Sequence, residues 1–150
     1  MDKIQMELFE QLTGLHEIPA GAYNIRANSK KDSRNTTANI DIVTKEDKDG
    51  IDIYVKPGTK NESVHISVVI SKTGLEECVY NDFHIADGVD VNIVAGCGIH
   101  NCGCEDSRHN GIHTFYVGKN AKVRYSEKHY GAGDGTGGRI LNPQTILYIG

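Results

Sequence analysis

Residues 113–125 read HTFYVGKNAKVRY: an aromatic run, a glycine turn and then an alternating strand. The same plan appears 32 residues earlier, where residues 85–93 read IADGVDVNI and Val89 takes the place of Ala121. A weaker copy begins at Val64, 25 residues before Val89. A unit of this kind, repeated with irregular insertions, is typical of the turns of a β-solenoid. An antiparallel β-sandwich alternates in the same way, and the pattern alone favours the two folds about equally.

Four segments of the chain alternate apolar and polar residues with a period of two, as half-buried strands require. They are residues 51–55, 64–68, 89–93 and 121–125. The turns between them carry Pro57-Gly58, Asp87-Gly88 and Gly118-Lys119-Asn120, which are residues that tight turns favour. The chain also has 17 glycines and no tryptophan. We therefore expect a mainly β protein.

The N-terminal third has a different pattern. Five apolar residues share one helical face, and Gly14 is a plausible stop for a short amphipathic helix that docks on the rest of the domain or on a partner. They are Ile4, Leu8, Phe9, Leu12 and Leu15. Residues 26–50 are polar, and their composition predicts loop with one edge strand at 38–43. The sequence thus predicts an N-terminal helix and loop region at 1–50 and a β core at 51–150, which the pattern alone leaves as either a β-solenoid or a β-sandwich.

Composition excludes several classes of function. Lys and Arg number 16 and Asp and Glu 20, so the net charge of −4 argues against a nucleic-acid surface and against an anionic membrane. The N-terminal MDKIQMELFEQL is too charged for a signal peptide, and no apolar run is long enough to span a bilayer. Four cysteines without a secretory signal favour a reducing, cytoplasmic location.

The stretch from His113 to Gly131 resembles the SufB/SufD family, the scaffold proteins of the SUF system of iron–sulfur cluster assembly. CGIHN at 97–101 precedes it and GTGGRILNP at 135–143 follows it. The family's recurring unit is a His, a short strand, Gly or Glu, then Lys-Asn-Ala-Lys-Val and an aromatic residue, and it is complete here at 113–125. The likeness covers about residues 83–145. It is closest to the shorter SufB/SufD-like proteins of anaerobic bacteria and archaea.

This resemblance implies a right-handed parallel β-helix and a non-enzymatic scaffold that assembles an iron–sulfur cluster. Family members receive sulfur from a desulfurase and build a nascent cluster where two β-helix subunits meet. They also bind SufC, an ABC-type ATPase, through a helical segment near their C-terminus. That segment and the family's sulfur-accepting cysteine have no counterpart before residue 150, so a short or truncated member without the ATPase contact is expected.

The last residues, 146–149, form an apolar strand without a polar cap. A solenoid turn buries its inner face only against a neighbouring turn, and an open edge offers unpaired backbone groups to another strand. We expect a homo-oligomer, or association with a second β-helix subunit, through this C-terminal edge.

The window CGIHNCGCEDSRHNGIH at 97–113 gathers three of the four cysteines and three of the seven histidines. Cys102 and Cys104 in extended backbone put both sulfur atoms on one face, and His109 and His113 have a spacing seen in zinc sites. The candidate residues for a transient iron–sulfur or sulfur site are Cys97, Cys102 and Cys104. The candidate metal ligands are Cys102, Cys104, His109 and His113, with His100 as a further one.

Two other functions remain open: a structural protein that holds zinc or iron in this window, and a degenerate family member that keeps only an interaction surface. A purely structural interpretation also remains. In it, Cys97 packs inward as a small apolar residue and Cys102 and Cys104 occupy a loop. Cys78 is then a buried strand residue, and three further histidines form hydrogen bonds within strands. They are His65, His84 and His129.

Enzyme motifs are weak. Gly133-x-Gly135-x-x-Gly138 has the spacing of a dinucleotide-binding fingerprint, but no buried strand precedes it and no helix follows it. It is better interpreted as a glycine loop between two strands. The chain has neither a phosphate-binding Gly-Lys-Ser/Thr loop nor a Gly-x-Ser-x-Gly elbow. We expect a protein that is not an enzyme.

Overall fold

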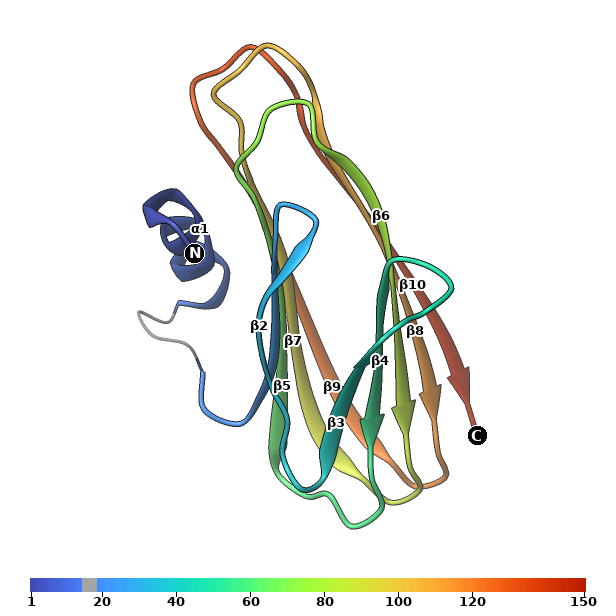
Figure 1. Ribbon diagram of the computed structural model, residues 1–150. Helices are drawn as coiled ribbons and strands as arrows, with labels where there is room; N and C mark the ends of the chain where they lie inside the picture. The colour runs from blue at the N-terminus through green and yellow to red at the C-terminus, as the bar shows by residue number, and fades with distance from the viewer. Residues whose placement is uncertain (15–18) are drawn as a thin grey trace.

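The strands of this protein form a parallel β-solenoid of about three turns, seen in a computed structural model that describes residues 1–14 and 19–150 (Figure 1). In chain order the elements are α1 (Lys3–Thr13), β1 (Ala22–Ala27), β2 (Lys30–Asn35), β3 (Ile40–Thr44), β4 (Gly50–Val55), β5 (Glu62–Ile70), β6 (Glu76–Ile85), β7 (Asp90–His100), β8 (Ser107–Val117), β9 (Lys122–Ala132) and β10 (Arg139–Ile149).

Two five-stranded sheets face each other as two layers (Figure 1). The first has the strand order β2-β1-β5-β7-β9 and the second β10-β8-β6-β4-β3. All neighbours are parallel except for two antiparallel hairpins, β1–β2 and β3–β4, which lie at the N-terminal end of the stack. Parallel pairing confirms the β-solenoid and excludes the antiparallel sandwich that the alternation alone left open.

The register confirms the 32-residue repeat. β6 pairs with β8 so that Phe83 lies beside Phe115, and the β7–β9 and β8–β10 pairs have the same offset. The earlier turn differs, because Val64 of β5 pairs with Ile93 of β7, 29 residues on, and the alignment of Val64 with Val89 was wrong. A shift of four residues keeps every side chain on the same face of the strand, so alternation cannot reveal it.

Apolar side chains from both sheets fill the interior near the C-terminal ends of β6 and β8. Phe83 and Phe115 stack with ring centroids 4.5 Å apart, and Tyr125 packs edge-on against Phe115 from the opposite sheet. A second, smaller apolar group, which contains Ile70 and Ile99, fills the interior near the other end of the strands. Between the two groups, most inward residues of β6 and β8 are polar, apart from Val79 and the Gly111 beside it.

The outer face of the second sheet carries a ladder of stacked rings. Tyr54, His84, Tyr116 and Tyr148 occupy equivalent positions on β4, β6, β8 and β10, with successive centroids 4.7, 5.3 and 5.3 Å apart. Parallel in-register pairing places equivalent side chains directly beside one another, so the ladder follows from the register.

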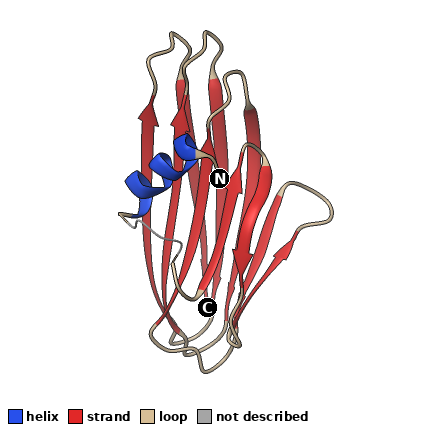
Figure 2. Cartoon of the chain, turned by 60° about the vertical axis from the view of Figure 1, so that its left-hand side comes forward, coloured by secondary structure: helices blue, strands red, loops and turns tan. Residues whose placement is uncertain are grey.

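Helix α1 packs against the outer face of the first sheet (Figure 2). Asp2 and Gln5 form a reciprocal capping box at its start, and Gly14 ends it in the left-handed conformation, as the sequence predicts. Leu8 and Leu12 are buried over Gly96 and Gly98 of β7, where a Cβ atom would lie only 3.2–3.3 Å from the leucine methyl groups. The helix approaches the sheet closely because these two positions carry no side chain.

Ile4, which the periodicity places on the buried face, is 38% exposed because it lies at the margin of the contact with the sheet. Leu15 lies outside the described residues. No helix in the described part of the chain has the length and apolar character needed to cross a membrane.

The segment before residue 50 holds more strand than its composition predicts. The strand expected at 38–43 is β3, but residues 30–35, expected to be loop, form β2 and pair with β1. The prediction of loop was wrong because β2 is an edge strand with mostly exposed side chains, so it lacks an apolar face. β1 in turn pairs in parallel with β5, which continues the solenoid sheet into the N-terminal third.

Gly50 provides a test of how tightly the β3–β4 hairpin is joined to the next turn. Its φ is +141°, and a Cβ atom there would lie 1.7 Å from the carbonyl oxygen of Tyr80. Gly50→Ala is expected to reduce the free energy of unfolding by more than about 3 kcal/mol, measured by urea denaturation. Gly88→Ala is the matched control, since Gly88 also has a positive φ but has open space around it. It is expected to cost about 1–2 kcal/mol, and equal losses for the two variants would contradict this account.

Candidate functional site: a polar belt inside the solenoid

The structure divides the cysteine and histidine window at 97–113 among three places. Cys97 is buried on the inner face of β7, and His100 is at the end of that strand. Cys102 and Cys104 are exposed in the loop between β7 and β8. His109 and His113 are buried on the inner face of β8. Among residues 1–14 and 19–150, no three of these six side chains bring ligand atoms within 4.8 Å of one another.

The loop at 101–106 is held by the buried side chain of Asn101. Its Nδ2 donates to the carbonyl oxygens of Glu105 (2.7 Å) and Gly138 (3.1 Å), and its Oδ1 accepts from the amide of Gly103 (3.0 Å). The exposed thiols of Cys102 and Cys104 flank Gly103 and lie outside the solenoid interior. The loop therefore separates them from the histidines that the sequence grouped with them.

A different set of chemically active side chains is brought together inside the solenoid. We call it the polar belt, and it consists of inward residues of β6, β7, β8 and β9. Its members are Glu77, Cys97, His109, His113, Glu127 and His129.

Glu77 anchors one end of the belt. Its Oε1 accepts from Nδ1 of His109 at 2.7 Å, and its Oε2 accepts from Nε of Arg26 at 3.0 Å and from the hydroxyl of Ser29 at 2.9 Å. Burial alone would raise the pKa of this carboxyl group, but His109 and Arg26 outweigh it and lower the pKa. Glu77 is thus a buried, fully hydrogen-bonded carboxylate.

His109 and His113 face the same gap. Because His109 uses Nδ1 to bind Glu77, its Nε2 is available as an acceptor or a metal ligand. A Cβ atom on Gly111, between them, would lie 3.1 Å from Nε2 of His109 and 3.1 Å from Nε2 of His113. The missing side chain at Gly111 therefore leaves the space at which both imidazoles point. Nδ1 of His113 is buried and has no hydrogen-bond partner among the described residues.

Glu127 anchors the other end of the belt, on the last strand of the first sheet. Its Oε1 accepts from the hydroxyl of Tyr125 at 2.6 Å and lies 3.5 Å from Nε2 of His113, and its Oε2 lies 3.3 Å from Nε2 of His129. Burial would raise the pKa of Glu127, but the hydrogen bonds from Tyr125 and His129 lower it overall. Burial and the bond to Glu127 raise the pKa of Tyr125, so the phenol stays protonated.

The belt keeps two of its groups neutral. Burial, with repulsion from His109 and His129, lowers the pKa of His113 to about 4 despite the attraction of Glu127. Burial, with the charges of Glu77 and Glu127, raises the pKa of the Cys97 thiol well above its usual range. At neutral pH the belt thus holds a neutral imidazole, a protonated thiol and two carboxylates.

A second group of possible ligands lies on the outer face of the second sheet. Asp52, Asp82 and His84 bring ligand atoms within 4.8 Å of one another. However, Lys45 already binds both carboxylates, at 3.0 and 2.9 Å, and Nε2 of His84 lies 3.0 Å from Asp52. The lysine ammonium group supplies the positive charge that a cation would bring, so this cluster is an ion-pair network.

Sequence reasoning missed both carboxylates of the belt. Glu77 is 32 residues before His109 and therefore lies beside it on the next strand, a relation that the repeat length could have revealed. His129 and His84 do form contacts with carboxylates in strands, as predicted, whereas Nδ1 of His65 has no partner among the described residues. Cys78 is exposed, so the prediction of a buried residue was wrong: it follows Glu77, whose side chain takes the inward position.

Comparison of the chain with protein-family models, with curated proteins and with solved structures finds no match in any of the three. The resemblance to the SufB/SufD family at residues 113–125 therefore rests on the sequence motif, and membership of that family is a proposal.

The lowered pKa of His113 predicts a pH dependence of stability. The unfolded imidazole titrates near 6.5 and the folded one near 4, so the contribution of His113 is complete above pH 6.5 and is lost as the pH falls towards 4. At about 1.4 kcal/mol per pH unit, this loss amounts to roughly 3 kcal/mol. His113→Gln, which cannot titrate, should show a flatter dependence between pH 6.5 and 4 in urea denaturation series. Equal slopes for the two proteins would refute the assignment.

Proposed function

We propose that this protein is a non-enzymatic scaffold of iron–sulfur cluster assembly, a short SufB/SufD-like member that handles iron or sulfur transiently in the polar belt. The observation that carries the proposal is the convergence of one thiol, three imidazoles and a carboxylate from three strands. These groups are Cys97, His109, His113, Glu127 and His129, which line one cavity.

The chemistry of these groups suits iron. Imidazole binds iron and zinc well, and thiolate adds the softer character that iron–sulfur species need. Nε2 of His109 is free to bind a metal because Glu77 holds Nδ1, which is the carboxylate–histidine arrangement that orients metal ligands in proteins. Cys97 would lose its proton on binding, so loading would release protons and depend on pH.

The distances between the ligand atoms of the belt favour transient over permanent binding of a metal ion. No three of its ligand atoms lie within 4.8 Å of one another, so a bound ion would require the side chains to move. A permanent structural zinc site, by contrast, holds four ligands in a closed tetrahedron with bonds of about 2.0–2.3 Å. Transient occupancy by iron as cargo is the function that this arrangement supports best.

The position of the belt relative to the open edge adds support. Glu127 and His129 are on β9, whose outer edge has no partner strand among the described residues, and the same holds for β10. Leu147 and Ile149 of β10 continue the inward apolar rows of Phe115 and Val117, yet they are 58% and 75% exposed. We propose that a second copy of the chain pairs with this edge and covers them, which would place the belt close to the subunit interface.

Anaerobic reconstitution with ferrous iron and sulfide tests the site. The chain is expected to develop charge-transfer absorption in the visible range, and Cys97→Ser and His113→Gln are each expected to reduce it at least about tenfold, because each removes a ligand. Cys78→Ser is the matched control, since it removes an exposed thiol on the outer face of β6. It should leave the spectrum unchanged.

The remaining outcomes each decide a point. Loss of the spectrum in Cys102→Ser or Cys104→Ser, but not in Cys97→Ser, would move the site to the loop and overturn the assignment to the belt. Stoichiometric zinc in the purified protein, with unfolding on chelation, would replace the scaffold by a structural zinc protein. If neither iron nor zinc binds and the chain still associates through its edge, only an interaction module is left.

The second-copy contact is tested by size-exclusion chromatography with light scattering. The 150-residue chain is expected to dimerise at high concentration, and Leu147→Lys is expected to shift it to monomer, because a charge would be buried in the new contact. Val43→Lys is the control, since Val43 is also exposed and apolar but lies on β3 at the opposite end of the stack. A clean monomer at high concentration would exclude self-association.

A further inference from the structure

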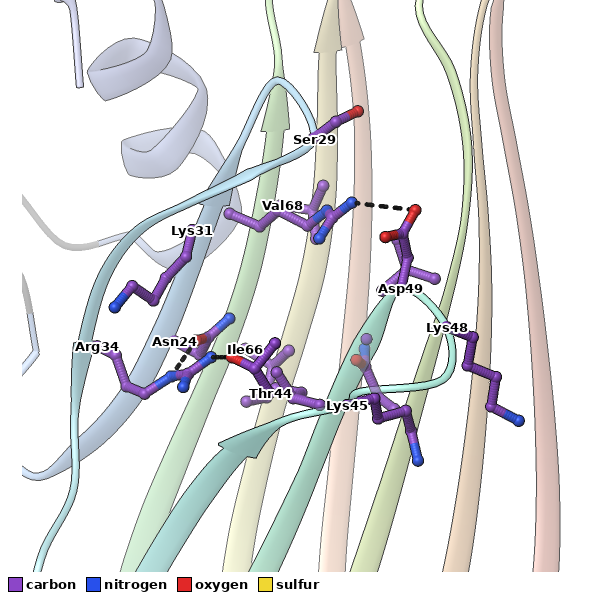
Figure 3. Close-up of a pocket in the computed structure, with 15 residues that line it drawn as sticks. Asn24, Ser29, Lys31, Arg34, Thr44, Lys45, Lys48, Asp49, Ile66 and Val68 are labelled. Atoms are coloured by element: carbon purple, nitrogen blue, oxygen red, sulfur yellow. Dashed lines mark hydrogen bonds and ion pairs between the residues drawn. The ribbon is translucent and has the colours of Figure 1, made fainter.

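A cavity of about 250 Å³ opens between the two N-terminal hairpins, and none of the side chains proposed to bind iron lines it (Figure 3). The β1–β2 hairpin forms one wall and the β3–β4 hairpin the other, and apolar residues of β5, such as Ile66 and Val68, form part of its floor. We call this cavity the hairpin pocket. Five of its lining residues are basic: Arg26, Lys31, Arg34, Lys45 and Lys48.

Two of these five charges are neutralised inside the protein. Arg26 binds the buried carboxylate of Glu77, and Lys45 binds Asp52 and Asp82. For the other three, which are Lys31, Arg34 and Lys48, no carboxylate oxygen in the described part of the chain lies within 4.0 Å.

Among the described residues that line the hairpin pocket, Asp49 is the one carboxylate, and it lies 4.0 Å from Arg26. The pocket therefore carries an excess of positive charge, although the whole chain has a net charge of −4. A local reversal of sign inside a concave site concentrates the field that attracts an anion.

Arg34 is held in place by neutral partners. Its Nε donates to Oδ1 of Asn24 at 2.8 Å, and one terminal nitrogen donates to the hydroxyl of Thr44 at 3.0 Å, so the side chain spans from one hairpin to the other (Figure 3). Burial lowers the pKa of Arg34, and the charge of Asp41 only partly offsets this. The guanidinium group is thus fixed and partly desolvated, with N–H donors left over for a ligand.

These features define the ligand class. The cavity is smaller than the roughly 300–1,000 Å³ of sites for drug-sized molecules, so its ligand is small. The remaining N–H donors of the planar Arg34 guanidinium match the oxygen atoms of a tetrahedral or bidentate oxyanion. We propose that the hairpin pocket binds a small oxyanion with at least two negative charges, of the phosphate class. This site stands independently of the iron–sulfur proposal, since it uses none of the groups that would bind iron.

Isothermal titration calorimetry of the full chain tests the proposal, with inorganic phosphate and pyrophosphate as probes and with chloride balancing the ionic strength. We expect saturable binding of one anion per chain. Arg34→Gln should weaken it at least about tenfold, because charge-assisted hydrogen bonds are lost. Lys48→Gln should weaken it about threefold, since an ammonium group at the rim contributes mainly long-range attraction. Tighter binding of pyrophosphate than of phosphate would indicate a diphosphate ligand, and the reverse a monophosphate.

Lys122→Gln is the matched control, because Lys122 is an exposed cation on β9 at the far end of the stack. It should bind as the natural sequence does. If Arg34→Gln fails to fold, the double variant Lys31→Gln, Lys48→Gln carries the test, since both side chains are exposed. The proposal is overturned if neither probe saturates the chain up to about 10 mM, or if Lys122→Gln weakens binding as much as Arg34→Gln does.

Discussion

Parallel, in-register pairing of the strands is the constraint on which the rest of this molecule depends. It places residues of neighbouring turns side by side, so each inward or outward position becomes a row that runs along the stack. Phe83 and Phe115 form one such row in the core, and Tyr116 and Tyr148 belong to another on the surface. The same rule puts Glu77 beside His109, so a buried carboxylate obtains its partner from the next turn.

The polar belt is costly to bury, and its surroundings show how that cost is met. Buried polar groups need hydrogen bonds, and both oxygens of Glu77 and both of Glu127 have donors or imidazoles within reach. Apolar residues flank the belt at both ends: one group includes Phe83 and Phe115, and the other includes Ile70, Ile99 and Cys97 itself. Such an arrangement adds little stability compared with a well-packed apolar core of similar volume.

Much of the fold could be predicted from the sequence, but less of the candidate site could. Alternation located β4, β5, β7 and β9, and the 32-residue likeness of the two best copies predicted the pairing of β7 with β9. β2 could not be predicted, because a polar edge strand lacks an apolar face. The prediction that Cys102 and Cys104 share a site with His109 was wrong. The two cysteines lie in an exposed loop that connects the two sheets, whereas His109 points into the interior from β8. Glu77 was missed because its partners come from other strands.

Because the turns of the solenoid are stacked along one axis, the free energy of local opening differs from turn to turn. Each turn contacts only its neighbours, so a terminal turn opens at a lower free energy than an internal one. The hairpins pack over the N-terminal end, whereas in the described part of the chain no strand pairs with the outer edges of β9 and β10. The belt extends from internal strands to an edge strand: Glu77 and His109 are on β6 and β8, which have neighbours on both sides, and Glu127 is on the edge strand β9. Local opening of β9 and β10 would therefore expose the belt from one side, while Glu77 stayed buried.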